Sequence, residues 1–240
     1  NLAHLEHLSM PWSDVTDRAI HALTGSSMRS LRALDLNQNW QITHEGIERL
    51  ANAPLAMSLD ELRICGVKLG IAGTDSLVDG RFLTSLRRLA VAGCELGDDA
   101  ATALFAAPSM AMLEALNLSK NELGDRALEA LSRTMHLYNL TSLDLSRNRG
   151  ITSDGIIALM NSPACANLTR LDLSETSVDD RALVAIAQSP YLVRLRSLSI
   201  RHTEVSIVGF RALASAPHLR FMEEVETYGL DLSDAHTREL

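Results

Sequence analysis

Aliphatic residues recur along this chain with a period close to 27 residues. The pattern LxxLxL begins at eight positions spaced 26 to 28 residues apart: Leu5, Leu31, Leu59, Leu86, Leu113, Leu140, Leu168 and Leu195. A ninth, degraded copy begins at Met222 and continues with Val225, Leu230 and Leu232. Self-similarity at a fixed period indicates a stack of repeated structural units. The sequence therefore predicts one array of repeats over residues 1–240 as a single domain.

The hydrophobic spacing changes within each unit. Alternating apolar positions predict a strand first, and apolar positions about four residues apart then predict a helix. Each helix carries a small residue, which we expect to let its backbone lie close to the strand that it covers: Ala19, Gly46, Gly73, Ala100, Ala127, Gly155, Ala182 and Gly209. Helices are expected to open at Asp, Thr or Ser, whose side chains accept bonds from free amides. They are expected to end before proline, at Pro54, Pro108, Pro163, Pro190 and Pro217.

The two kinds of element have different natural spacings. Neighbouring parallel strands lie about 4.8 Å apart, whereas packed helices lie about 8 to 10 Å apart. Stacking the units must therefore bend the array. The predicted fold is a right-handed α/β solenoid of eight to nine repeats, with parallel strands on the concave face and helices on the convex face.

Two segments carry a family resemblance: LEALNLSKNELGDRALEAL (113–131) and LTSLDLSRNRGITSDGIIALMNSP (140–163) resemble leucine-rich repeats. Most copies resemble the ribonuclease-inhibitor-like class, and two copies, 39–43 and 148–152, resemble the cysteine-containing class. The resemblance implies an asparagine ladder between repeats, which Asn39, Asn121 and Asn148 would form. Val67 departs from that column, and its repeat, 59–85, also lacks the proline and has four glycines. We expect this repeat to be the least rigid.

Composition and net charge limit the classes of partner that this chain could bind. Aromatic residues make up 4% of the chain, so the core must consist almost wholly of Leu, Ile, Val, Ala and Met. The 22 Lys and Arg residues against 30 Asp and Glu give a net charge of −8, which argues against nucleic-acid binding. No apolar run approaches the length of about 18 residues that membrane insertion requires. We expect a soluble protein in a reducing compartment, and the start at Asn1 leads us to expect a piece of a longer protein.

The sequence contains no recognisable catalytic or cofactor motif. Cys65, Cys94 and Cys165 form no CxxC pair and fall in three different repeat columns, which disfavours a disulfide or a metal site. There is no HExxH, no GxSxG and no glycine-rich phosphate loop. We therefore expect no catalytic residue, no metal and no small-molecule cofactor.

The concave face is the predicted functional surface. Strand residues that alternate with the buried leucines must project from it, and they vary between repeats while the core columns do not. The candidate partner-binding residues lie on this face and its rim: Trp12, Asp35, Trp40, Arg63, Arg88, Asn117, Lys120, Asp144, Arg147, Arg170, Asp172, Arg201 and His202. A stretch of small residues should form a smooth middle: Ala90, Ala92, Gly93 and Ala115. A merely solvated sheet face or an interface on the helices stays open as an alternative.

These features predict a non-catalytic module that recognises another protein. The helix openings, such as 125–128, are similar to GALA-like arrays of bacterial effectors, which implies a role in targeting a host-cell protein. Two alternatives follow from the resemblance. One is a GTPase-activating protein, for which Arg88, Asn117, Lys120 and Arg147 are available. The other is the substrate-recognition part of a ubiquitin-ligase-linked protein.

Overall fold

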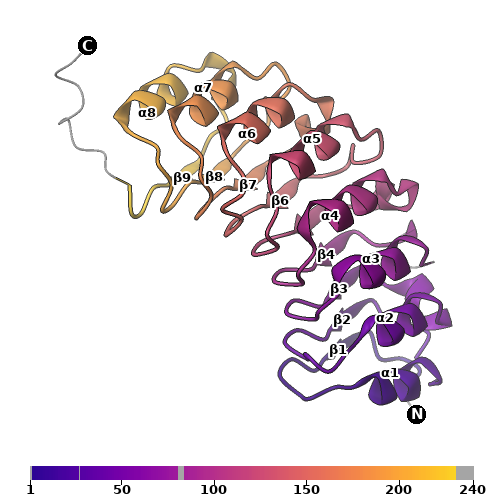
Figure 1. Ribbon diagram of the computed structural model, residues 1–240. Helices are drawn as coiled ribbons and strands as arrows, with labels where there is room; N and C mark the ends of the chain where they lie inside the picture. The colour runs from indigo at the N-terminus through magenta and orange to yellow at the C-terminus, as the bar shows by residue number, and fades with distance from the viewer. Residues whose placement is uncertain (1, 27, 81–83, 231–240) are drawn as a thin grey trace.

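The computed structural model describes residues 2–26, 28–80 and 84–230, and within them it forms one curved array of repeats (Figure 1). Nine parallel strands form a single sheet whose order follows the chain: β1 (His7–Ser9), β2 (Ala33–Asp35), β3 (Glu61–Arg63), β4 (Arg88–Ala90), β5 (Ala115–Asn117), β6 (Ser142–Asp144), β7 (Arg170–Asp172), β8 (Ser197–Ser199) and β9 (Glu224–Glu226). The predicted ninth copy thus begins with a strand. Its Leu232 lies outside the described residues.

Helices line the outer side of the arc, and strands line the inner side (Figure 1). The α-helices are α1 (Asp17–Thr24), α2 (His44–Ala51), α3 (Gly70–Val78), α4 (Gly97–Ala106), α5 (Asp125–Arg133), α6 (Ser153–Met160), α7 (Asp180–Gln188) and α8 (Ile207–Ala214). Four prolines begin short 3-10 helices: η1 (Pro54–Ser58), η3 (Pro108–Met112), η4 (Pro163–Cys165) and η5 (Pro217–Leu219). The predicted alternation of strand and helix is confirmed.

The register repeats without slippage. Each strand aligns its central apolar residue with that of the next, as Leu34 does with Leu62 and Leu62 with Leu89. These three leucines are at most 2% exposed and form part of one continuous aliphatic core. Phe105 is the one aromatic side chain among the buried core residues that the structure describes. The expectation of a core built from aliphatic residues is confirmed.

The asparagine ladder is present where it was expected. Asn148, fully buried, accepts bonds at Oδ1 from the amides of Asn121 (2.8 Å) and Leu123 (3.1 Å) in the preceding repeat. Its Nδ2 donates to the carbonyls of Leu118 (3.1 Å) and Leu145 (2.8 Å), so one side chain satisfies backbone groups in two repeats. Val67 occupies the same position without a polar atom.

The small helix residues were expected to bring each helix close to its strand. At three glycines the structure shows a different reason for the small size. An added Cβ on Gly155 would lie 2.5 Å from Oδ1 of Asp125, on the preceding helix, and not against the strand beneath. Asp125 reaches across the repeats, because its Oδ1 accepts from the Thr152 amide and its Oδ2 from the Thr152 hydroxyl, both at 2.7 Å. The same arrangement places Asp17 against Gly46 and Asp180 against Gly209. These glycines make room for an aspartate that joins neighbouring helix starts.

Candidate functional site

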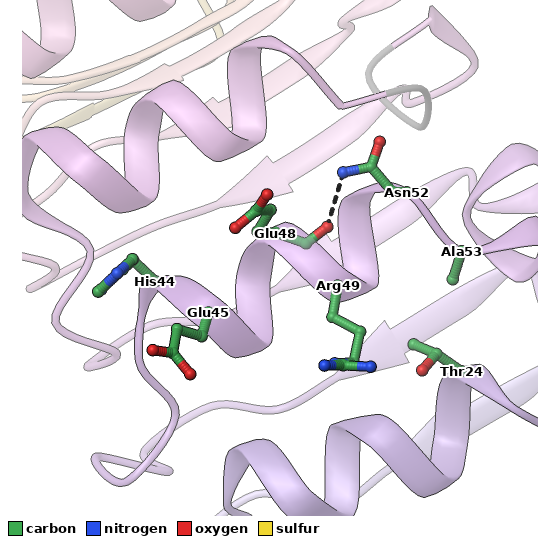
Figure 2. Close-up of a pocket in the computed structure, with 7 residues that line it drawn as sticks. All are labelled: Thr24, His44, Glu45, Glu48, Arg49, Asn52 and Ala53. Carbon is green, nitrogen blue, oxygen red and sulfur yellow. Dashed lines mark hydrogen bonds between the residues drawn. The ribbon is translucent and has the colours of Figure 1, made fainter.

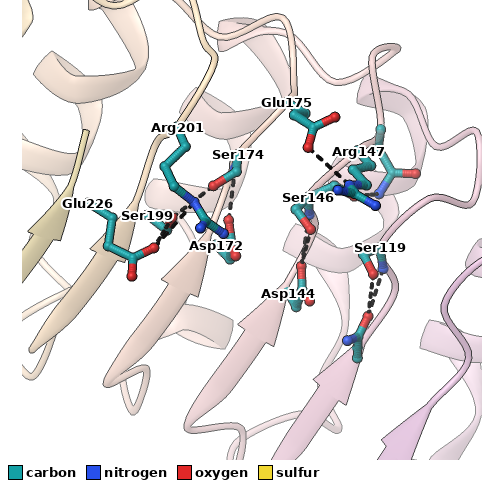
Figure 3. A network of polar contacts seen from close by, with 12 residues as sticks. Ser119, Asp144, Ser146, Arg147, Asp172, Ser174, Glu175, Ser199, Arg201 and Glu226 are labelled. Carbon is teal, nitrogen blue, oxygen red and sulfur yellow. Dashed lines mark hydrogen bonds and ion pairs between the residues drawn. The ribbon is translucent and has the colours of Figure 1, made fainter. Parts of the chain in front are cut away.

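The concave face carries polar side chains at the ends of the strands, and several of them also hold the following turn. Oδ1 of Asp144 accepts from the amide (3.0 Å) and the hydroxyl (2.7 Å) of Ser146 (Figure 3). Asp172 and Asp35 each accept in the same way from the amide two residues later. Asn117 makes the equivalent contacts with an uncharged side chain. Each of these four candidate residues therefore stabilises the turn that follows its strand and is also accessible on the concave face.

Asp144 and Asp172 form an acidic pair on this face. They are aligned on the adjacent strands β6 and β7. Burial raises the pKa of Asp144 above its usual 3.8, the hydrogen bonds from Ser146 lower it, and the charge of Asp172 raises it further; the net shift is upward. The structure thus brings together two predicted site residues as a concentrated negative charge.

Arg63 and Arg88 meet around a residue that the sequence did not single out. Nε of Arg63 lies 2.5 Å from one carboxylate oxygen of Glu61, and Nε of Arg88 lies 2.8 Å from the other. Burial alone would raise the pKa of Glu61, but the bonds and charges of Arg88 and Arg63 outweigh it and lower the pKa below 4.5. The only sequence signal for this cluster is that Glu61 and Arg88 share a register column.

Two further candidate arginines are also paired. Nε of Arg147 lies 3.0 Å from Glu175, and Nε of Arg201 lies 3.3 Å from Glu226 (Figure 3). For Lys120 and Arg170, both exposed, no ion pair is found among the described residues. The concave surface therefore carries ion-paired arginines beside an acidic pair, Asp144 and Asp172, for which the described part of the chain shows no ion pair.

A column of residues just beyond the strands forms the rim, and its backbone is left-handed in each of the nine repeats. The column comprises Trp12, Gln38, Gly66, Gly93, Lys120, Arg147, Glu175, His202 and Gly229. Their φ angles lie between 53° and 80°, a conformation that favours glycine. The amides of this column donate to carbonyls of the next repeat, as Lys120 does to Ser146 at 2.9 Å. The turn is thereby fixed, and each rim side chain has a defined direction.

Aromatic side chains mark both ends of the rim. Trp12 and Trp40 are 67% and 56% exposed, and their rings meet edge to face with centroids 5.4 Å apart. At the other end, His202 meets Tyr228 in the same geometry at 5.3 Å. The predicted solvent exposure of both tryptophans is confirmed, whereas sequence reasoning did not identify Tyr228.

Two hollows adjoin on this side of the molecule. One, of about 450 Å³, lies over β3 to β6 and is lined by residues including Arg88, Ala90, Asn117 and Asp144. The other, of about 400 Å³, follows the rim from Trp40 to Arg147. Cys65 lines both. The predicted smooth middle lies within these hollows: Ala90, Ala92, Gly93 and Ala115.

The convex face has a separate hollow of about 710 Å³ between α1 and α2 (Figure 2). Its walls are polar and include Glu45, Glu48 and Arg49. A guanidinium nitrogen of Arg49 lies 2.8 Å from Nδ1 of His21, and Nδ2 of the Asn52 side chain donates to the Glu48 carbonyl at 2.9 Å. None of the candidate site residues lines this hollow.

The cysteines are free thiols in the structure. Burial raises the pKa of Cys94 to about 12 and that of Cys165 to about 11, so both stay protonated at neutral pH. The described residues contain no group of three or more His, Cys, Asp or Glu side chains placed to hold a metal ion. Among them, no helix is long and apolar enough to cross a membrane.

Comparison with protein families gives one match. The family described as Leucine Rich repeat matches residues 27–51, 82–105, 109–132, 136–160 and 164–187, which together make up about half of the chain. No curated protein matches the sequence.

Solved structures share the fold. An internalin of Listeria monocytogenes (inlF) superimposes with a TM-score of 0.61 and 20% identity over 92% of this chain and 57% of its own. This chain thus spans little more than half of that internalin. A second internalin from the same organism (inlC2) has a TM-score of 0.51 and 21% identity over 98% of this chain and 76% of its own. A chain in the structure of the yeast Rad7 and Elc1 complex gives a TM-score of 0.48 at 15% identity, and the match covers 99% of this chain and 76% of that chain.

Proposed function

This chain belongs to the leucine-rich repeat family, and we propose that it is a non-catalytic module that recognises another protein through its concave face and rim. The observation that carries the proposal is the pair of adjoining hollows on that side, lined by side chains that vary from repeat to repeat. A smooth floor lets a partner approach closely, and mixed charges around it give orientation and specificity.

The test compares charge reversal on the two faces. Asp144→Arg with Asp172→Arg reverses the acidic pair, and we expect it to abolish affinity capture of the partner that the unaltered chain retains. Glu48→Arg with Glu129→Arg, both exposed on convex helices, is the matched control and should preserve capture. If the concave variant captures the same partner equally well, the proposed surface is wrong.

Because Asp144 and Asp172 hold turns, a second variant separates charge from structure. Asp144→Asn with Asp172→Asn keeps the Oδ1 acceptor, as Asn117 does in the same column. Weakened capture by this variant, with an unchanged circular dichroism spectrum, would assign the effect to the lost charge. If capture fails only with the Asp144→Arg and Asp172→Arg variant, the loss is due to the size of the arginine side chains or to a disturbed turn.

The more specific form of the proposal is the targeting domain of a bacterial effector that acts in a host cell. It is supported by the resemblance of the helix openings to the GALA-like arrays of bacterial effectors. Such a protein would be secreted, and a catalytic or ligase segment would lie outside these residues. The complete reading frame tests this, because an adjoining secretion signal supports the role and its absence opposes it.

The GTPase-activating alternative requires polar groups that are free to reach a nucleotide. Arg88 is held by Glu61 and Arg147 by Glu175, so two of the four available residues are already paired. No observation favours this alternative or a ubiquitin-ligase link over simple protein binding. A GTP-hydrolysis assay against a panel of small GTPases should therefore show no acceleration.

A further inference from the structure

The rim hollow has a different character at each of its ends. At one end Trp40, whose ring meets that of Trp12 edge to face, presents exposed aromatic surface. At the other end Lys120 and Arg147 present cationic groups on exposed side chains. Gly66 and Gly93 lie between them and add no side chains of their own, and the Gln38 side chain lies against Gly66. The result is an open trough with an apolar end and a basic end.

The charge of this trough is opposite to that of the chain. Its lining contains three cations, Lys68, Lys120 and Arg147, against one carboxylate, Glu95. Glu95 is paired with Lys68 at 3.1 Å, and Arg147 with Glu175 at 3.0 Å, which leaves Lys120 without an ion-pair partner among the described residues. On a molecule of net charge −8, this local excess of positive charge favours an acidic ligand.

The spacing of the two ends suits an extended peptide. The turn of Trp40 belongs to the second repeat and Lys120 to the fifth, so three strand spacings of about 4.8 Å separate them, or about 14 Å. An extended chain covers this distance with about four residues. The amides of Gly66 and Gly93 already donate to Ala92 and Ser119, so the floor offers a peptide no free amide from these glycines. Recognition must therefore come from side chains at the two ends.

We propose that this trough binds an extended segment of a partner protein that has an apolar side chain and an acidic side chain about four residues apart. The apolar side chain contacts Trp12 and Trp40, and the carboxylate contacts Lys120. This inference rests on the proposed protein-binding function and adds to it a site and a ligand motif. Paired, exposed tryptophans are the type of residue that contributes most binding energy at protein interfaces.

The first experiment selects ligands from a random twelve-residue peptide display library on the immobilised 240-residue chain. We expect the enriched peptides to share an apolar residue and an Asp or Glu three to five positions apart. The chain itself supplies the second readout, because Trp12 and Trp40 are its only two tryptophans. Saturable change in tryptophan emission on titration with a selected peptide therefore reports occupancy of this site.

Two variants test the assigned contacts with a fluorescently labelled selected peptide. Trp12→Ala with Trp40→Ala should raise Kd at least about tenfold, as should Lys120→Glu. Matched controls are Tyr138→Ala, an exposed aromatic outside the trough, and Arg133→Glu, an exposed cation on α5; both should leave Kd unchanged. Circular dichroism confirms that each variant is folded.

Failure of this inference is distinguishable from failure of the proposed function. Peptides without the motif, or peptides whose affinity survives both trough variants, would overturn the trough assignment. If such peptides lose affinity with Asp144→Arg and Asp172→Arg, the concave module stands and only the trough is wrong. A library that yields no enriched peptide also overturns the trough, and partner capture then decides the module separately.

Discussion

Single side chains in this protein often serve the turn and the surface together. Asp144 accepts two bonds from Ser146, yet it lies beside Asp172 on the accessible inner face. Its bonds need an acceptor oxygen, which Asn117 also supplies in the equivalent position. The negative charge is therefore not required by the turn. Half-buried beside a second carboxylate, that charge is a cost to the fold.

This cost gives a pH-dependent prediction for Asp144→Asn. Because the folded-state pKa of Asp144 is raised above 3.8, its ionised form destabilises the fold at pH values above the folded pKa. The variant should have a higher urea midpoint than the unaltered chain at pH 7. The difference should disappear near pH 3, where the carboxyl is protonated in both states. Urea titrations at several pH values measure it.

Asp14→Asn, at an exposed position between β1 and α1, is the control and should leave the midpoint unchanged. A lower midpoint for Asp144→Asn at pH 7 would mean that the carboxylate stabilises the fold, contrary to the direction of its shift.

Adjacent helices are joined by more than apolar packing. In three repeat pairs an aspartate at a helix start bonds to the Thr or Ser that precedes the next helix, and a glycine in that helix leaves it room. The expected Asp caps therefore have two forms. Asp179 accepts from the amide of Arg181 in its own helix, whereas Asp125 accepts from the following repeat. Residue type alone could not separate these forms.

The aspartate contact predicts that Gly155→Ala is destabilising, although alanine is the better helix former by about 1 kcal/mol. The new Cβ would lie 2.5 Å from Oδ1 and 3.1 Å from Cα of Asp125, and the latter atom cannot move without the backbone. We expect a loss of about 1 to 3 kcal/mol in the free energy of unfolding, measured in urea.

A double-mutant cycle identifies the cause. Asp125→Ala removes the carboxylate, so Gly155→Ala should cost less in that background than alone. Equal costs in both backgrounds would show that Asp125 is not the obstacle.

The third repeat lacks the asparagine contacts that fix the repeat of α5. Val67 places no polar atom in the ladder column, where the repeat of α5 has Asn121, whose Nδ2 donates to the carbonyls of Val91 and Leu118. Of the predicted least rigid repeat, 59–85, residues 81–83 lie outside the described part. Hydrogen exchange of the α3 amides should be about tenfold or more faster than that of the α5 amides, which belong to a repeat with an asparagine rung. Equal protection of α3 and α5 would contradict this.

At the scale of the whole molecule, periodicity made the fold predictable and concealed much of the site. Each core column recurs in every repeat, so strand and helix positions could be predicted from spacing, and the asparagine ladder from the resemblance to leucine-rich repeats. Side-chain partners do not recur in this way. The pairing of Arg63 and Arg88 with Glu61, and the edge-to-face contact of His202 with Tyr228, depend on the directions of side chains that differ from repeat to repeat. The left-handed rim column was hidden because six of its nine residues are not glycine.

A linear array should also unfold in parts, because each repeat is stabilised by its neighbours alone. Sheet order follows chain order, and the helices pack against the helices next to them in sequence. Asn39→Ala removes a buried side chain that bonds the amides of Ser13 and Val15 and the carbonyls of Met10 and Leu36. We expect it to cost about 3 kcal/mol, since several buried backbone groups lose their partners.

The effect should be local, and the two tryptophans reveal it because both lie in the first two repeats. Asn39→Ala should lower the urea midpoint followed by tryptophan emission more than the midpoint followed by far-ultraviolet circular dichroism. Asn148→Ala removes the equivalent side chain from the sixth repeat and should do the reverse. If both probes shift together in both variants, the array unfolds as one cooperative unit, and coupling between repeats exceeds the cost of a lost rung.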